Sequence, residues 1–181
     1  MNWIRRPVFL LCAAGLIGIA TPAAADTSTD VARLAKAGQT EAALALIDQA
    51  LVANPRDPQL RFRKGVLLAE ARRETEAIAI FTQLNEEYPE LAEPYNNLAV
   101  LYAGQGDYDK ARAALQAAVR SNPAYATAYE NLGDVYLRLA ARAYERAQAL
   151  DAGRGALAPK VAQLKSLVPD RPPDVGSRPP E

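Results

Sequence analysis

The sequence predicts an all-α protein built from helical hairpins that stack one on another. Some residues recur every 34 positions, as Pro55, Pro89 and Pro123 do. Alanine, the strongest helix former, is abundant, whereas β-branched and aromatic residues are sparse in the middle of the chain. Half of the 181 residues are hydrophobic, which is the composition of a globular protein and not of a disordered one.

The N-terminal segment 1–25 has the organisation of a secretory signal peptide. Arg5 and Arg6 form a positive region, the apolar run 8–20 follows, and the alanines at 23–25 form an A-x-A cleavage site. The apolar run is short, because a membrane-spanning helix needs roughly 20 residues. We therefore predict cleavage after Ala25 and export to the bacterial periplasm. The alternative is an uncleaved segment that anchors the chain in the inner membrane.

The only cysteine, Cys12, lies inside this apolar run and follows Phe9, Leu10 and Leu11. Small residues precede the cysteine of a lipoprotein, so we interpret Cys12 as part of the signal. The chain has no histidine, and after cleavage it has no cysteine to form a disulfide. The usual general base, the thiolate nucleophile and most transition-metal ligands are then absent. We expect no enzyme activity, no metal and no cofactor.

The charge balance argues against a nucleic-acid partner. The chain has 21 Lys and Arg against 21 Asp and Glu, and loss of Arg5 and Arg6 leaves 19 against 21, a net charge of −2. A nucleic-acid-binding protein presents a basic surface that displaces counterions. The expected partner is a protein or peptide, and membrane contact is expected only through the signal before cleavage.

The 34-residue period extends to several positions of the repeat. The recurring sets are Ala43, Ala77 and Ala111; Ile47, Phe81 and Leu115; Gly65, Ala99 and Gly133; and Leu34, Leu68, Tyr102 and Tyr136. The best copy, 92–125, has Tyr95, Leu98, Ala99 and Tyr102 on its first helix, Ala111, Leu115 and Ala118 on its second, and then Pro123. The next copy opens with Tyr129, Leu132, Gly133 and Tyr136.

These residues, between about 30 and 151, resemble the pattern of the tetratricopeptide-repeat (TPR) family. The resemblance implies a right-handed superhelix of about 3.5 helix–turn–helix units whose first helices line a concave groove. Exported bacterial members of this size serve envelope assembly, secretion or pilus biogenesis. We therefore expect a scaffold protein of the cell envelope.

Physical reasons support the pattern. Positions 4, 7, 8 and 11 of a repeat share one helix face, and a small residue at position 8 lets the second helix approach closely. Gly106 and Asp107 end one helix and begin the next. Asn54-Pro55 and Asn122-Pro123 end second helices, because the residue before proline avoids the helical region.

The units predicted from this register follow the chain in order. Residues 26–57 form a partial first TPR with helices near 28–37 and 40–53. Residues 58–91 form a second TPR with helices near 58–72 and 74–88. Residues 92–125 form a third TPR with helices near 92–105 and 108–121. Arg61 and Lys64 depart from the family at positions 4 and 7 of the second repeat. The boundary between repeats 1 and 2 is therefore expected to be less apolar than the next.

The fourth repeat, 126–151, lacks its turn. Ala140, Tyr144 and Ala147 are the best counterparts of Ala111, Leu115 and Ala118, but each comes five positions too early for the 34-residue period. We predict one continuous helix over 127–150, about 36 Å long, that projects beyond repeat 3. Its apolar stripe comprises Leu132, Tyr136, Leu139, Ala143, Ala147 and Leu150. A capping helix over 156–168 and a disordered proline-rich tail over 169–181 complete the chain.

The candidate client site is the groove face of the first helices, at positions 2, 5 and 9 and their neighbours. It comprises Phe62, Val66, Glu93, Asn96, Asn97, Val100, Glu130, Asn131 and Asp134. The face grades from apolar to acidic, which suits a segment with one apolar and one basic end. The lysine, arginine and asparagine clamp of chaperone-tail-binding TPR domains is absent, so no preference for an acidic C-terminus is expected. The alternative function is self-association, with a homodimer formed through the fourth and C-terminal helices.

Overall fold

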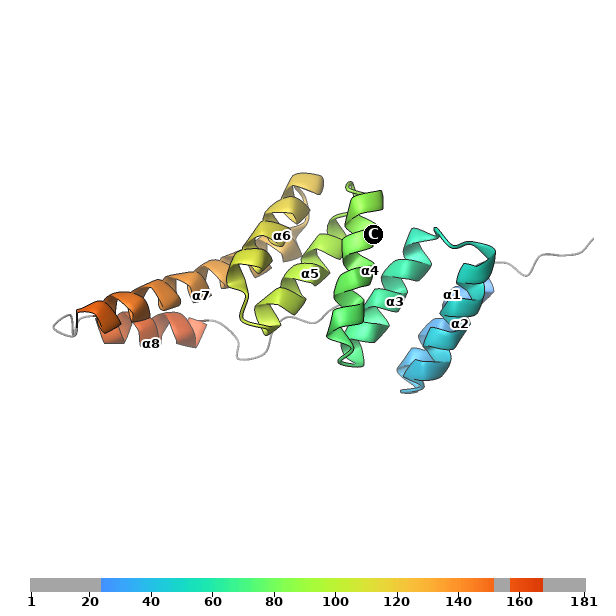
Figure 1. Ribbon diagram of the computed structural model, residues 1–181, viewed down its shortest axis with the longest axis horizontal. Coiled ribbons are helices and arrows are strands. Elements are labelled where there is room, and N and C mark those ends of the chain that lie inside the picture. Colours follow the sequence, from blue (N-terminus) through green and yellow to red (C-terminus); the bar gives the residue numbers. More distant parts are fainter. Residues whose placement is uncertain (1–23, 152–156, 168–181) are drawn as a thin grey trace, which may run out of the picture.

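The computed structural model describes residues 24–151 and 157–167, and these residues form eight α-helices and no strand (Figure 1). The helices are α1 (Ala24–Lys36), α2 (Thr40–Ala53), α3 (Pro58–Glu70), α4 (Glu74–Glu87), α5 (Ala92–Gly104), α6 (Tyr108–Ser121), α7 (Ala126–Leu150) and α8 (Leu157–Leu167). The all-α prediction is confirmed. The signal at 1–23, with Cys12, and the tail at 169–181 lie outside the described residues, whereas Ala24 and Ala25 begin α1.

The helices stack in chain order as hairpins, and each contacts the next along the sequence (Figure 1). Residues 34 apart occupy equivalent places in the core. Ala43 and Ile47 of α2, and Ala77 and Phe81 of α4, have no exposed surface. Burial of a side chain the size of Ile or Phe contributes about 1.5–3 kcal/mol. The 34-residue register is therefore set by burial at each interface between helices.

The turns inside the first three hairpins share one backbone conformation. Gly38, Arg72 and Gly106 follow the 34-residue period and have φ of 72°, 62° and 77°. At each turn the amide of this residue and the amide of the following residue donate to carbonyls of the preceding helix, for example Gly106 N to Ala103 O at 3.0 Å and Asp107 N to Tyr102 O at 2.9 Å. The sequence predicts that the first helix of repeat 2 ends near Arg72, but α3 ends at Glu70. The left-handed conformation of Arg72 explains the difference.

Helix α7 is continuous over 25 residues, as predicted from the missing turn. Ala140, the counterpart of Gly106 one period later, is helical, so the turn conformation is absent there. Arg142 joins α7 to the turn between α5 and α6, because its guanidinium lies 4.9 Å from the ring of Tyr108 and donates to Gly106 O at 2.9 Å. The second half of α7 projects beyond α6, and α8 packs along it (Figure 1).

The two edges of the stack are held by different contacts. On the connector edge, Tyr88 donates its hydroxyl to Arg56 O at 2.8 Å, and Ser121 donates to Pro89 O at 2.6 Å. On the hairpin-turn edge, charged side chains take part: Arg73 lies 3.5 Å from Glu41, and Gln105 donates to Glu74 at 3.3 Å. Each contact joins one repeat to the next.

Candidate client-binding face

The nine predicted client-binding residues lie on the three first helices α3, α5 and α7. Helix α5 contacts both α3 and α7, so the structure brings these residues into one row along the array. Phe62 and Val66 come from α3, and Glu130 and Asp134 from the first half of α7. We call this row the first-helix face.

The middle of the first-helix face is buried, which differs from the expectation that it is open. Asn96 and Asn97 have no exposed surface, and Val100 and Asn131 are also buried. Helix α5 contacts α3, α4, α6 and α7, so little of its surface is left open. The accessible members of the face are Phe62, Val66, Glu93, Glu130 and Asp134.

Two buried asparagines join α5 to α7. Asn131 donates from its Nδ2 to the Oδ1 of Asn96 at 2.8 Å. A buried polar group needs such a partner, because leaving it unpaired costs about 1–3 kcal/mol. The Nδ2 of Asn96 has no hydrogen-bond partner within the described part of the chain. Asn97, the next residue, donates from its Nδ2 to the backbone oxygen of Glu93 at 3.1 Å. The bond between Asn131 and Asn96 thus links α7 to α5, whereas the bond of Asn97 stays within α5.

The α3 end of the face is apolar. Phe62 is half-buried, and its ring lies 5.7 Å from that of the fully buried Phe81 at an angle of 54°. Val66, one turn further along α3, is half-buried as well. Part of each side chain therefore remains open to an apolar group of a partner.

The α7 end of the face is acidic. Glu130 is exposed, and Asp134 follows it one helical turn later. Burial, and then the charge of Glu130, raise the pKa of Asp134, while Arg138 acts in the opposite direction. A nearby cation reduces the repulsion between two such carboxylates, so a basic group of a partner would be favoured here.

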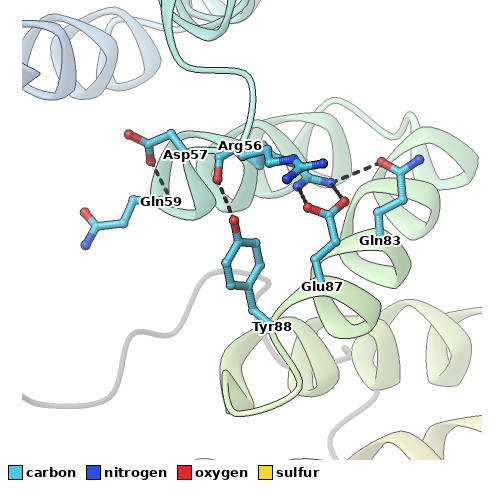
Figure 2. Close-up of polar contacts among 7 residues, drawn as sticks. Arg56, Asp57, Gln59, Gln83, Glu87 and Tyr88 are labelled. Atoms are coloured by element: carbon cyan, nitrogen blue, oxygen red, sulfur yellow. Dashed lines mark hydrogen bonds and ion pairs between the residues drawn. The ribbon is translucent and has the colours of Figure 1, made fainter.

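A polar cluster between α3 and α4 was not predicted as part of the site (Figure 2). Arg61 is buried at the family's aromatic position and donates to Glu87 at 2.7 and 3.1 Å and to Gln83 at 3.3 Å. The hydrogen bond from Arg61 lowers the pKa of the Glu87 carboxyl. In the sequence, the only sign of this cluster is that Arg61 departs from the family pattern. The partners of Arg61 are known only from the structure.

Lys64, the second departure in repeat 2, lies at the boundary with repeat 1. Its Nζ is 2.6 Å from Asp48 of α2. This boundary is polar in part, as expected from the two basic residues.

The repeat positions predicted to be buried differ between repeats. Leu98 and Ala99 of α5 are buried, and Tyr95 and Tyr102 are partly buried. In repeat 4, Leu132 is partly buried, but Tyr129 and Tyr136 are 50% and 47% exposed and Gly133 is exposed. The reason is the straight course of α7, because no second helix folds back over these residues.

Within residues 24–151 and 157–167, no group of three or more Asp, Glu, His or Cys side chains is placed to hold a metal ion. Among these same residues, no helix combines the length and the apolar character that crossing a membrane requires.

Three family models match overlapping parts of the chain. Models described as tetratricopeptide repeat match residues 33–92 and 80–113, and a model described as TPR repeat matches residues 101–139. Together they run from α1 into α7 and end close to the position at which α7 continues in place of a turn.

The chain is also similar to individual proteins. It is 37% identical over 84 residues to the chloroplastic tetratricopeptide repeat domain-containing protein PYG7 of Arabidopsis thaliana. The match covers 44% of this chain but only 28% of that protein, so the chain spans less than a third of this relative's length.

Two solved structures have the same fold. A thermophilic TPR protein of Thermus thermophilus superposes with a TM-score of 0.57 at 24% identity, covering 80% of this chain and 82% of that one. YrrB, described as a TPR protein with an unusual peptide-binding site, superposes with a TM-score of 0.54 at 26% identity, covering 61% and 57%.

Proposed function

We propose a function from the premise that this chain is a tetratricopeptide-repeat protein: it is a non-enzymatic adaptor that binds a segment of a client protein along the first-helix face. The observation that carries the proposal is the alignment of α3, α5 and α7 in one row, with accessible side chains at both ends. The similarity to YrrB, whose description includes a peptide-binding site, supports the same class of function.

The chemistry of the face defines the client. Phe62 and Val66 favour an apolar side chain at the α3 end, and the pair Glu130 and Asp134 favours a basic one at the α7 end. Glu93 lies between them on α5. The client is therefore an extended or helical segment with an apolar end and a basic end, and the buried Asn96 and Asn131 hold the spacing between its two contacts.

We further propose that the protein works in the bacterial cell envelope, because residues 1–25 have the pattern of a signal peptide. N-terminal sequencing of the protein from a periplasmic fraction should begin at Asp26. A chain that begins at Met1 and fractionates with the inner membrane would support the anchored alternative.

Site-specific photo-crosslinking tests the client site. A photoreactive phenylalanine analogue at Phe62 should give a discrete adduct with a client in cells. The same analogue at Val52, an exposed residue of α2 outside the first-helix face, is the control. Glu130→Lys should weaken the Phe62 adduct, because it reverses the charge at the far end of the face. Equal adducts from Phe62 and Val52 would contradict the proposal.

A second candidate function is self-association through α7 and α8. The observation that favours it is the exposure of large apolar side chains on these helices, namely Tyr129, Tyr136, Leu150 and Leu167. Multi-angle light scattering tests it directly. A mass of one chain at every concentration would exclude this candidate and leave the adaptor function standing.

A further inference from the structure

Helix α7 carries an apolar stripe with the spacing of a coiled coil. Seven residues alternate by steps of four and three along its whole length: Tyr129, Gly133, Tyr136, Ala140, Ala143, Ala147 and Leu150. None of them is charged, whereas the six charged residues of α7 all lie off the stripe. Such a repeat is the pattern by which one helix packs along another.

Most of this stripe is exposed within residues 24–151 and 157–167, where Ala140 and Ala147 are its partly buried members. Tyr129, Tyr136 and Leu150 are 50%, 47% and 72% exposed, and Gly133 and Ala143 are exposed too. Helix α8 packs on a neighbouring face of α7, where Lys160 lies 5.6 Å from the ring of Tyr144 and Lys165 Nζ lies 2.6 Å from Glu145. The stripe therefore lies beside α8 and is not covered by it.

In repeat 2, the second helix α4 covers the surface of α3 that corresponds to the stripe. In repeat 2, a Cβ on Gly65 would meet the Phe81 ring at 2.7 Å, because α4 packs directly on the glycine. Gly133 occupies the same position of repeat 4, and a Cβ there would meet nothing within 4 Å. Among the residues that the structure describes, none occupies the place of the second helix of repeat 4.

The missing turn prevents the chain from filling this place itself. The second helix of repeat 4 is continuous with the first, so it points away from the surface it would otherwise cover. When a hinge is too short for an element to fold back on its own chain, that element commonly packs on an identical chain instead, which is domain swapping. The same element in a second copy remains free to reach the surface.

We infer that a second copy of this chain docks on the stripe, with the two α7 helices antiparallel about a twofold axis near Ala140. The order of side-chain sizes suits this pairing. Tyr136 of one copy meets Ala143 of the other, Gly133 meets Ala147, and the two Ala140 residues meet at the axis. Tyr129 and Leu150 close the two ends, so the small residues allow close approach in the middle.

The pairing has two geometric consequences. The seven positions cover about 32 Å of α7, so contact extends along most of the helix. Because α8 lies on an adjacent face, α7 and α8 of both copies form a four-helix bundle, from which the two repeat arrays extend in opposite directions. The inference deepens the self-association candidate and does not depend on client binding.

Substitutions at two alanines distinguish docking on the stripe from docking on another surface of α7. Ala143 and Ala149 are both exposed on α7, but Ala149 lies off the stripe, about 120° around the helix from Ala143. Ala143→Glu should convert the dimer to a monomer with unchanged circular dichroism, because it buries two charges against Tyr136. Ala149→Glu should leave the dimer intact. A dimer that survives Ala143→Glu would overturn the inference but keep self-association, whereas a monomeric wild-type chain would overturn both.

A symmetric crosslink tests the register. In a Cys12→Ser background, Ala140→Cys should form a disulfide-linked dimer on mild oxidation, because the two thiols meet at the axis. Ala149→Cys is the matched control, since antiparallel pairing about Ala140 separates its two copies by about 27 Å along the helix. Efficient linkage at Ala149 and none at Ala140 would overturn the antiparallel arrangement.

Discussion

The ring of Phe81 lies directly on the Cα of Gly65, in the space that a Cβ would occupy. Phe81 has no exposed surface, so its ring cannot move aside without disturbing the core between α3 and α4. Gly65→Ala should therefore lower the free energy of unfolding by about 1–3 kcal/mol, as overpacking does. Urea denaturation measures the change.

Gly133 provides the opposite case at the same repeat position. No described neighbour in the same chain lies within 4 Å of its would-be Cβ, so in the monomer Gly133→Ala should raise the free energy of unfolding by about 0.5–1 kcal/mol through helix propensity alone. The same denaturation experiment compares the two variants. Equal effects of the same sign would contradict the vacancy described in repeat 4.

Arg72 holds a conformation that its two counterparts, Gly38 and Gly106, adopt without steric cost. Its side chain is 85% exposed and lies 3.7 Å from Glu74, so little packing is lost on its removal. Arg72→Gly should raise the free energy of unfolding by up to about 1 kcal/mol. Gly106→Ala is the reciprocal control and should lower it by a similar amount. No difference between wild type and Arg72→Gly would show that the left-handed backbone is not strained.

The hydrogen bond between Asn131 and Asn96 can be measured by a double-mutant cycle. Asn131→Ala leaves the Asn96 oxygen buried and unpaired, so a loss of about 1–3 kcal/mol is expected. The double variant with Asn96→Ala should lose less than the sum of the two single losses. Gln116→Ala, which removes an exposed bond to the Tyr136 hydroxyl, is the control and should change stability by less than about 0.5 kcal/mol.

The raised pKa of Asp134 predicts a pH-dependent gain from Asp134→Asn. A folded-state pKa above the unfolded value means that ionised Asp134 destabilises the fold, and that this penalty disappears as pH falls through the raised pKa. At pH 7 the variant should be more stable by about 0.2–0.5 kcal/mol, the range of a like-charge pair on a helix. Below the ordinary aspartate pKa, about 3.9, the two proteins should be equally stable. A gain that persists at pH 3 would point to another cause.

The straight course of α7 should change if the missing turn is restored. Inserting a copy of segment 104–108 after Leu137 returns Ala140 to the 34-residue register of Ala111. The inserted glycines end the helix, so the second half should fold back and shorten the particle in small-angle X-ray scattering. Insertion of five alanines is the control, because it keeps the helix and lengthens it by about 7.5 Å.

The fold was predictable because the same burial rule repeats. Phe81 and Leu115 occupy equivalent buried places in successive repeats, and any chain that repeats this pattern must stack its hairpins. The straight α7 was predictable too, since no glycine or proline interrupts the helix formers after Tyr136. The end of α3 was placed two residues too late, because an arginine gives no sign of a left-handed turn.

The candidate face was only partly predictable. Helical spacing placed Phe62, Glu93 and Glu130 on accessible surface, but it placed Asn96 there as well, although that side chain is buried. Burial depends on how many neighbours enclose a helix, and periodicity within one helix carries no such information. The partners of Arg61 were unpredictable for the same reason, because Glu87 lies 26 residues away on another helix.

The two edges of the stack are expected to differ in their response to salt. Side-chain charges such as Arg73 and Glu41 join neighbouring repeats on one edge, and dissolved ions screen them over about 8–10 Å. On the other edge the hydroxyls of Tyr88 and Ser121 bind main-chain carbonyls and carry no net charge. Rising ionic strength should therefore weaken the contacts of the first edge more than those of the second. The curvature of the solenoid should then depend on salt concentration, while its helix content stays the same.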